Sequence, residues 1–567
     1  MIEVGPSATS RYRWVVPLAA AWAVCLGLLL AWTLGTPAQV LRQQLRVLQF
    51  WSLETCVALG LVVSATMLKD ALRLVEKRHL PGVVVPLVVG LGLTVGVAGR
   101  TNRIFYDEQI YQNVGQNLAD LRRAQLCNDG ALDQGRLRCS IAEYNKQPYA
   151  YPHLLSLVYR AVGVGAAPSF VINAVATGLS IVFVYVFVLL VFGDAVAAFF
   201  AALLLALTPQ QLIWSASAAV EPSASAACLA ALVAAACFVR LGSIVSLLGV
   251  AVASAYAAQF RPESMLIVPV LALFVWQRSP REFARPRVWW AGLIFLVLAA
   301  VHLAHTAAVR NEGWGTTQAR MSLEYVVANL RSNGRFYVAD ARFPALYSFL
   351  ALIGVTAWRG DKGRLTLASY FLLFFGVALL FYAGSYDYGA DVRYSLATYP
   401  ALTMLGGLGV ARLTRLFDRA GLGALAVPLL AGVLALQFIW YLPPVRSTDD
   451  GAWAARADVR FAESLVRDLP SNAYVLTQNP GMFQVWGVNA GQTSLVATNA
   501  SRLDDLARQY VGGVYLHWNF WCNVQDPIQR GYCTQVLAMH SGRVVREERV
   551  RDQRFALYSL NTTPPRR

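Results

Sequence analysis

Long apolar runs separated by short polar connections make up most of the first 440 residues. A run of about 20 apolar residues can cross the hydrocarbon core of a bilayer as a helix. Thirteen runs approach this length, and several of them fall short of it: 14–34, 47–68, 80–99, 168–192, 194–208, 222–240, 243–259, 264–277, 288–306, 343–358, 365–384, 394–411 and 423–442. We therefore predict a polytopic α-helical membrane protein with about thirteen transmembrane helices.

The first long polar interruption covers residues 102–152 and begins with the acid pair Asp107 and Glu108. Behind this pair, apolar residues recur at steps of three and four, at Ile110, Val114, Leu118 and Leu121. This spacing predicts an amphipathic helix. Such a helix is expected to lie flat on the bilayer surface. The acid pair would then be accessible to a lipid head group and to a water-soluble molecule.

The composition changes after Pro443 and Pro444, where the long apolar runs stop. Helical and strand patterns alternate beyond this point, which predicts a soluble α/β domain. Helices are expected at 458–468, 501–510 and 527–539, and strands at 473–477, 513–517 and 544–560. The chain is thus divided into a transmembrane region at 1–444, which includes the loops 100–152 and 307–342, and a C-terminal domain at 445–567.

The net charge of +16 could indicate a nucleic-acid partner, but the basic residues lie mainly in alternate short connections. Such asymmetry is typical of the cytoplasmic loops of membrane proteins. The basic connections are Lys69 to Arg78, Arg278 to Arg287, Arg359 to Arg364 and Arg412 to Arg419. With a cytoplasmic N-terminus and an odd number of spans, both long loops and the C-terminal domain are expected outside the plasma (inner) membrane.

Eight cysteines divide into two groups. Four lie in apolar runs, where cysteine usually packs as a small hydrophobic residue. The other four form two close pairs in segments predicted to be external, Cys127 with Cys139 and Cys522 with Cys533. We predict two disulfides formed in an oxidising compartment. Neither pair has the C-x-x-C spacing of a zinc site.

Further ionisable residues fall at the external ends of predicted spans: Lys146, Glu221, Arg261, Glu263 and Arg393. Charges at membrane depth are costly and are usually paired or functional. Several of the candidate residues also have a structural interpretation. Asp107 could cap a helix, Arg261 and Glu263 could form a local ion pair, and Lys146 could extend toward head groups.

The order of these motifs resembles the GT-C superfamily of membrane glycosyltransferases. It is closest to the subgroup of protein O-mannosyltransferases and lipid A aminoarabinose transferases. The resemblance rests on the acid pair, K-x-P-x-x-x-P from Lys146, Glu221-Pro222, Arg261-Pro262-Glu263 and R-Y-S-L-x-x-Y-P from Arg393. It implies a polyprenyl-phosphate sugar as donor and a lipid, glycan or protein as acceptor.

The same resemblance implies roles for individual residues. Asp107 would be the general base and Glu108 its neighbour in the catalytic pair. Lys146, helped by Arg261 or Arg393, would hold the leaving phosphate, while Glu221 and Glu263 would face the same cavity.

The chain departs from the aminoarabinose transferase pattern at Ile110, where those enzymes have arginine, and at Asn145, where they have glutamate. The loop 307–342 contains no histidine, and His305 just before it is interpreted as a buried structural residue. No cofactor is assigned and no metal ligand is named, although a divalent metal stays open.

Two other functions compete with the glycosyltransferase. A transporter or flippase for a polyprenyl-linked or anionic solute would need ionisable groups on broken helices near mid-membrane, whereas the charges here gather at one surface. A scaffold that displays the C-terminal domain would leave the acidic and basic residues without a purpose.

Overall fold

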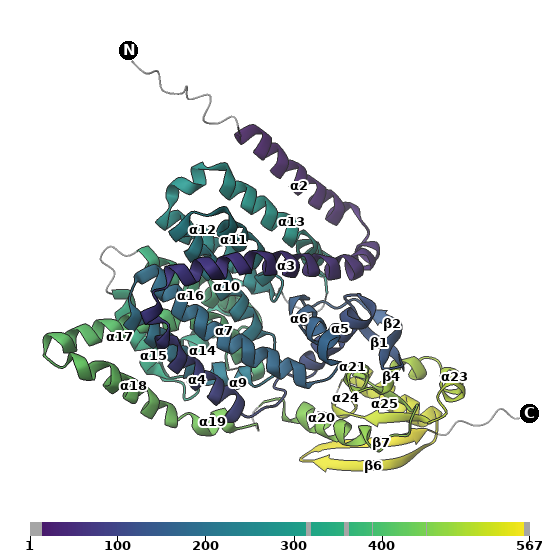
Figure 1. Ribbon diagram of the computed structural model, residues 1–567. Coiled ribbons are helices and arrows are strands. Elements are labelled where there is room, and N and C mark those ends of the chain that lie inside the picture. The colour runs from purple at the N-terminus through teal and green to yellow at the C-terminus, as the bar shows by residue number, and fades with distance from the viewer. Residues whose placement is uncertain are drawn as a thin grey trace, which may run out of the picture.

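The computed structural model describes residues 14–312, 319–356, 362–387, 389–448, 451–524 and 526–560. A body of helices holds most of the first 448 residues, and a mixed sheet lies at one side of it (Figure 1). Each of the thirteen apolar runs lies on a helix, as the sequence predicts. The chain is mostly helical, with several strongly apolar helices.

The body is built in three stretches. The first contains α2 (Val15–Gly35), α3 (Ala38–Leu74), η1 (Lys77–His79) and α4 (Pro81–Gly96). The long polar loop folds into α5 (Asp107–Leu121), β1 (Leu126–Asp133), β2 (Arg136–Glu143) and α6 (Ala150–Val162). The remainder contains α7 (Ala167–Phe192), α8 (Ala195–Ala206), α9 (Pro209–Ser215), α10 (Glu221–Leu241), α11 (Ile244–Ala257), η2 (Pro262–Leu266), α12 (Ile267–Arg278), η3 (Pro280–Ala284), α13 (Pro286–Ala308), η4 (Leu323–Tyr325), α14 (Val326–Ala339), α15 (Ala345–Thr356), α16 (Lys362–Leu380), η5 (Gly389–Thr398), α17 (Tyr399–Arg419), α18 (Gly423–Ile439) and α19 (Leu442–Arg446).

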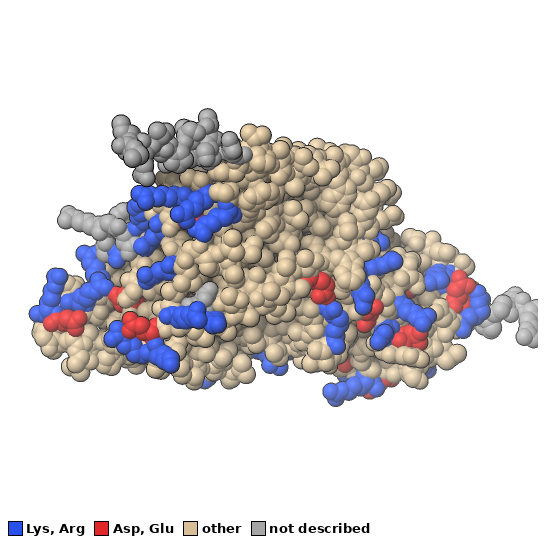
Figure 2. Space-filling model, turned by 45° about the horizontal axis from the view of Figure 1, so that its top comes forward, with Lys and Arg blue, Asp and Glu red and all other residues tan. Residues whose placement is uncertain are grey.

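Among the described residues, seven helices are long and apolar enough to cross a membrane. The count is eight if the bent pair α8 and α9 forms one span, and α11, α15 and α18 are shorter apolar helices. The number thirteen therefore stays a prediction, because several runs give helices shorter than a perpendicular span. Large apolar side chains are exposed along α2, α3, α4, α16 and α18. Figure 2 shows charged side chains toward two sides of one face and a broad uncharged area between them. The protein is an integral membrane protein.

The centre of the body is formed by small residues that let helices approach closely. A Cβ atom added at Gly354 of α15 would lie 2.0 Å from the carbonyl oxygen of Leu405 on α17. One added at Gly409 of α17 would lie 2.0 Å from the carbonyl oxygen of Leu350 on α15. Glycine at both positions is therefore required for this helix pair, as is common between transmembrane helices.

Helix α5 forms where the sequence predicts it, but it does not lie open on a surface. It packs between α6 and the C-terminal segment, so that ten of its fifteen residues are buried. The side chain of Asn113 donates to Gln484 Oε1 at 2.8 Å, and that of Gln116 donates to the Gln484 carbonyl at 3.2 Å. The polar face of α5 thus finds its partners about 370 residues later in the chain, and the expectation that this helix lies flat on a bilayer stays a prediction.

The C-terminal segment folds into helices around a sheet, as the alternating pattern predicts. Its helices are α20 (Trp453–Val466), α21 (Pro480–Val485), α22 (Ser494–Ala497), α23 (Arg502–Gln509), α24 (Phe520–Asn523) and α25 (Pro527–Met539). Its strands are β3 (Tyr474–Thr477), β4 (Asn489–Gln492), β5 (Val514–Trp518), β6 (Gly542–Val550) and β7 (Gln553–Leu560).

The sheet has seven strands in the order β2-β1-β4-β3-β5-β7-β6. β3 pairs in parallel with β4 and β5, whereas β1 pairs antiparallel with β4 through Asp129 opposite Gly491. The hairpin β1-β2 thus comes from the first long loop and completes a sheet formed mainly by the last 120 residues. This sheet attaches the loop that carries Asp107 to the C-terminal segment.

Candidate functional site

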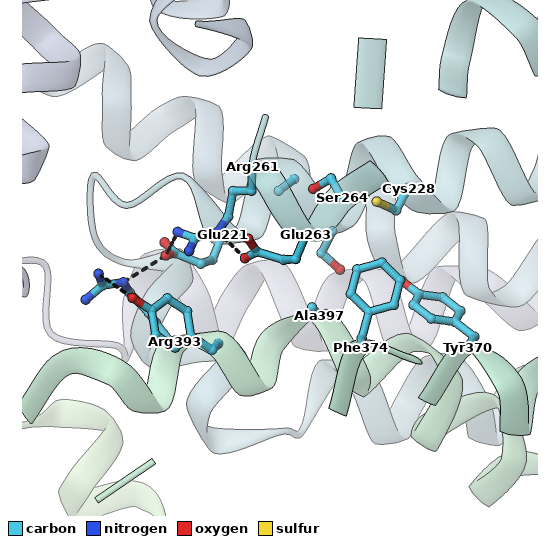
Figure 3. A pocket seen from close by; sticks show the side chains of 12 residues that line it. Glu221, Cys228, Arg261, Glu263, Ser264, Tyr370, Phe374, Arg393 and Ala397 are labelled. Carbon is cyan, nitrogen blue, oxygen red and sulfur yellow. Dashed lines mark hydrogen bonds and ion pairs between the residues drawn. The ribbon is translucent and has the colours of Figure 1, made fainter. Parts of the chain in front are cut away.

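Five of the seven ionisable residues singled out in the sequence converge from four separate elements, and Glu108 and Lys146 lie apart from them. Asp107 begins α5, Glu221 begins α10, Glu263 lies in η2 and Arg393 lies in η5, with Arg261 directly before η2. Their side chains form one continuous cluster of ion pairs, of which Figure 3 shows the contacts among Glu221, Arg261, Glu263 and Arg393. Short loops at the ends of helices bring them together, which is the common location for functional groups.

Glu221 is the centre of the cluster and is almost fully buried. Its Oε1 lies 2.9 Å from Arg393 Nε, and the same oxygen accepts a hydrogen bond from Arg261. Arg261 also donates to Glu263. A buried carboxylate needs such partners because removing one of them costs about 3–5 kcal/mol. Both arginines are therefore engaged by acids in this structure.

Asp107 occupies the open edge of the cluster. Its Oδ2 lies 3.9 Å from Arg393 Nη2, and about a third of its side chain is exposed. It is the first helical residue of α5, and the N-cap position belongs to Tyr106. The carboxylate thus has the accessibility that a general base needs, with Arg393 beside it.

Glu108, the second acid of the predicted pair, has a different environment. Its Oε2 accepts from the backbone amides of Arg103 at 2.8 Å and Ile104 at 3.2 Å, and its Oε1 accepts from Ala218 at 2.9 Å. Burial raises its pKa to about 8, although these amides and Arg103 act in the opposite direction. Both oxygens are used to tie the segment before α5 to the α9-α10 connection.

Two residues of η5 belong to the cluster and were not singled out in the sequence. Asp391 Oδ1 lies 3.5 Å from Arg393 Nη1, and burial raises the pKa of this carboxyl to about 6 against the effect of Arg393 and Arg261. The ring of Tyr394 lies 5.0 Å from the guanidinium of Arg261 and 4.9 Å from that of Arg393. Their position around Arg393 in A-D-V-R-Y was the available signal.

A cavity of about 20 Å³ lies behind the cluster, lined by Glu221, Arg261 and Arg393 on one side and by Cys228, Tyr370 and Phe374 on the other (Figure 3). This is room for about one water molecule. The cluster is thus closed toward the helical body, and Asp107 lies on its more accessible side.

A much larger cavity of about 500 Å³ lies next to it. Its polar lining is mainly basic or imidazole: Lys146, His302, His305, Arg310 and Arg320. Pro262 also lines it, whereas the neighbouring Arg261 and Glu263 line the small cavity. The turn that begins η2 therefore separates this basic cavity from the cluster of ion pairs around Glu221.

His305 is buried, as the sequence interpretation has it, and its Nδ1 lies 2.6 Å from the hydroxyl of Tyr144. Its position in the wall of the large cavity was not predicted. Within the described residues, no group of three or more histidine, cysteine or acidic side chains could hold a metal ion.

Comparison with known proteins identifies the fold. Over 85% of this chain and 97% of the other, the structure matches ArnT from Cupriavidus metallidurans bound to undecaprenyl phosphate, with a TM-score of 0.55 and 15% identity. It matches the archaeal oligosaccharyltransferase AglB from Archaeoglobus fulgidus, in complex with an inhibitory peptide and a dolichol-phosphate, over 86% of this chain and 75% of the other, with a TM-score of 0.51 and 14% identity. The chain has the GT-C fold. No curated protein matches it significantly in sequence.

A sequence model of the family described as dolichyl-phosphate-mannose-protein mannosyltransferase matches residues 146–305 of this GT-C chain. The matched region begins at Lys146 and ends at His305, which both line the large cavity. It also contains Glu221, Arg261 and Glu263. The family resemblance in sequence therefore covers part of the wall of the large cavity and three residues of the ion-pair cluster, whereas Arg310, Arg320, Asp107 and Arg393 lie outside it.

Both predicted disulfides are confirmed in the GT-C structure. Cys127–Cys139 joins β1 to β2, and Cys522–Cys533 joins α24 to α25. The other four cysteines are free, and three of them are buried. The first disulfide closes the hairpin that follows α5, and the second fixes a short helix that contacts the residue before Asp107.

Proposed function

We propose that this protein transfers a sugar from a polyprenyl-phosphate donor to an acceptor hydroxyl. The proposal is supported by the GT-C fold, by the family match over 146–305 and by the polyprenyl phosphates named with both structural relatives. The observation that carries it is the arrangement at η2, where a basic cavity of about 500 Å³ adjoins a cluster containing a partly exposed aspartate.

The donor phosphate is assigned to the basic cavity. Lys146, Arg310 and Arg320 line it together, and cations of this kind bind phosphate oxygens by charge-assisted hydrogen bonds. Arg320 is held in place by its bonds to the carbonyl oxygens of Val309 and Arg310. These cations would also neutralise the charge that grows on the phosphate as it leaves.

Asp107 is assigned as the general base. The acceptor oxygen attacks the anomeric carbon and its proton passes to the Asp107 carboxylate. The bond from the anomeric carbon to the phosphate oxygen breaks with its electron pair on the polyprenyl phosphate. The leaving phosphate thereby gains a negative charge beside Lys146, and no other reactant is required.

Arg261 and Arg393 are assigned to positioning rather than to the phosphate. Each already contacts Glu221, and Arg393 also lies near Asp107. A cation shared by several carboxylates holds them together, but the carboxylates neutralise its charge. Such a cation therefore has no net positive charge left to attract a phosphate. Glu221 and Glu263 are accordingly the acids that orient these two arginines.

The reaction is placed on the extracytoplasmic face of the plasma membrane, with a cytoplasmic N-terminus. The two disulfides support this side, because they form in oxidising compartments. A lipid-linked donor suits this location, since nucleotide sugars are made in the cytoplasm. A lipid, a glycan or a protein could supply the acceptor hydroxyl, and the sugar could be a hexose or a pentose.

The test is transfer by purified full-length protein in lipid nanodiscs, with polyprenyl-phosphate donors labelled in the sugar. The expected result is labelled acceptor together with free polyprenyl phosphate. A transporter or flippase would move the labelled donor across the membrane of proteoliposomes without breaking the sugar-phosphate bond. The donors tested are a panel of hexosyl and pentosyl lipids. The proposal would be refuted if intact donor moved across the membrane and the sugar-phosphate bond of no donor in the panel was cleaved.

A further inference from the structure

Tyr106, the residue directly before Asp107, reaches into the C-terminal segment. Its hydroxyl donates to Asp458 Oδ2 on α20. The other oxygen, Asp458 Oδ1, lies 3.0 Å from His517 Nε2 on β5. His517 Nδ1 lies 3.2 Å from Thr477 Oγ1 on β3, which in turn accepts from Asn519 at 3.0 Å.

All members of this chain of contacts are buried. Asp458, His517, Thr477 and Asn519 have no measurable exposed surface, and Tyr106 is 6% exposed. A buried carboxylate is costly unless hydrogen bonds satisfy it. Here the C-terminal segment supplies Asp458 and the imidazole beside it, and the residue next to Asp107 supplies the hydrogen bond that Asp458 Oδ2 accepts.

The aromatic surroundings hold Tyr106 in the same place. Its ring lies 5.8 Å from that of Trp521, and the ring of Phe105 lies 5.3 Å from that of Phe520. Phe520 and Trp521 lie on α24, which the Cys522–Cys533 disulfide joins to α25. The side chains of Phe105 and Tyr106 therefore pack on an element that is itself fixed.

On the other side of Asp107, Glu108 binds the backbone amides of Arg103, Ile104 and Ala218 in the helical body. Asp107 thus lies between two anchors, Tyr106 to the C-terminal segment and Glu108 to the body. An exposed side chain between two buried neighbours keeps a fixed position only while both anchors hold.

We propose that Asp458 and His517 are positioning residues that place the Asp107 carboxylate through the Tyr106 hydroxyl. The proposal rests on the proposed function for the role of Asp107. The C-terminal segment then contributes to turnover without contacting donor or acceptor. Displacing a catalytic group by about 1 Å can cost on the order of a hundredfold in rate.

The test uses Tyr106→Phe in the full-length protein, which removes one hydroxyl and keeps the ring. The chain offers a matched control in Tyr474→Phe. Tyr474 is a buried tyrosine of β3 whose hydroxyl donates at 2.5 Å to Asp129 on β1. Both bonds join the first long loop to the C-terminal segment, but only that of Tyr106 adjoins Asp107.

Two measurements are made on both variants. The first is amide hydrogen exchange of the peptide 103–112 in nanodiscs, which needs no substrate. We expect faster exchange of this peptide in Tyr106→Phe and wild-type exchange in Tyr474→Phe. The second is steady-state transfer, for which we expect kcat to fall by about ten- to a hundredfold in Tyr106→Phe with the donor KM within about twofold of wild type. Asp458→Asn keeps an acceptor for Tyr106 and should retain more activity than Asp458→Ala.

Unchanged exchange in Tyr106→Phe, or equal loss of kcat in Tyr106→Phe and Tyr474→Phe at equal melting temperature, would overturn the positioning role. Failure of the proposed function gives a different result. In that case the wild-type protein transfers no sugar, although exchange near Asp107 still changes in Tyr106→Phe. If only the role of Asp107 as base fails, Asp107→Asn keeps wild-type transfer.

Discussion

The substitution Asp107→Asn separates a catalytic from a structural role, because the structure limits what Asp107 contributes to stability. The side chain does not occupy the N-cap, and its contact with Arg393 is 3.9 Å long and partly exposed. An exposed ion pair contributes about 0.2–1 kcal/mol, and a charge in the first helical turn about 0.3–1 kcal/mol. The loss of stability should therefore not exceed about 2 kcal/mol.

The loss of rate should be larger than this. A positioned general base contributes about a hundred- to ten-thousandfold, which corresponds to about 2.7–5.4 kcal/mol in the activation barrier. Glu108 is not expected to replace Asp107, because adjacent side chains on a helix point about 100° apart and its oxygens already accept three backbone bonds.

The assay is transfer from a competent polyprenyl-phosphate sugar by purified protein, together with its melting temperature. Asp391→Asn is the matched control, because it removes another carboxylate that lies near Arg393. We expect it to lose no more than about tenfold in kcat. If Asp107→Asn turned over at near the wild-type rate, its role as base would have to be abandoned.

Three further predictions concern Lys146 in the large cavity, Glu108 beside Asp107, and Asp391 in the ion-pair cluster. Lys146→Ala should raise the donor KM by roughly ten- to more than a hundredfold, since one charge-assisted contact contributes about 1.5–3 kcal/mol. Lys146→Arg should recover part of this loss. Unchanged donor kinetics in Lys146→Ala would exclude the contact. Glu108→Gln should lower the melting temperature more than Asp107→Asn does, because an amide cannot accept all three backbone bonds, and equal melting temperatures would contradict this. Burial raises the pKa of Asp391 to about 6, so the folded state binds its proton more tightly than the unfolded state. The contribution of this group to stability is therefore greatest below about pH 4 and declines as the pH rises to about 6, and melting curves of Asp391→Asn should lack this component.

The helices of the body could be predicted because a bilayer allows only segments that satisfy their own backbone. An apolar run such as 168–192 therefore had to be a helix, and it corresponds to α7. The number of spans could not be obtained in the same way. Runs such as 343–358 give short helices, and their length does not show whether they cross.

The side chains of the site were predictable in part. Glu221, Arg261 and Arg393 stand at span ends next to proline or tyrosine motifs, and the structure brings them together. Asp391 also stands at a span end, two residues before Arg393, but a single acid in a loop is usually only solvated. The partners of α5 carried no local signal, because Gln484 is distant in sequence and has no unusual chemistry.

The link from Tyr106 to Asp458 and His517 was also beyond the reach of sequence reasoning. A histidine within a strand pattern and an aspartate within a helix pattern are ordinary residues of an α/β domain. Only the pairing of the loop hairpin with the C-terminal sheet brings Tyr106 next to them.

The hairpin β1-β2 also sets an order of events during synthesis. About 330 residues separate its end at Glu143 from the start of β3 at Tyr474, which is roughly 15–65 s of translation. An isolated two-stranded hairpin is marginally stable in water, and the Cys127–Cys139 bond can hold it during this interval. The edge of β1 that pairs with β4 stays unpaired until nearly the whole chain has been made. A nascent chain therefore acquires Asp107 early and the support for it last, so truncated products that insert correctly would still lack an assembled site.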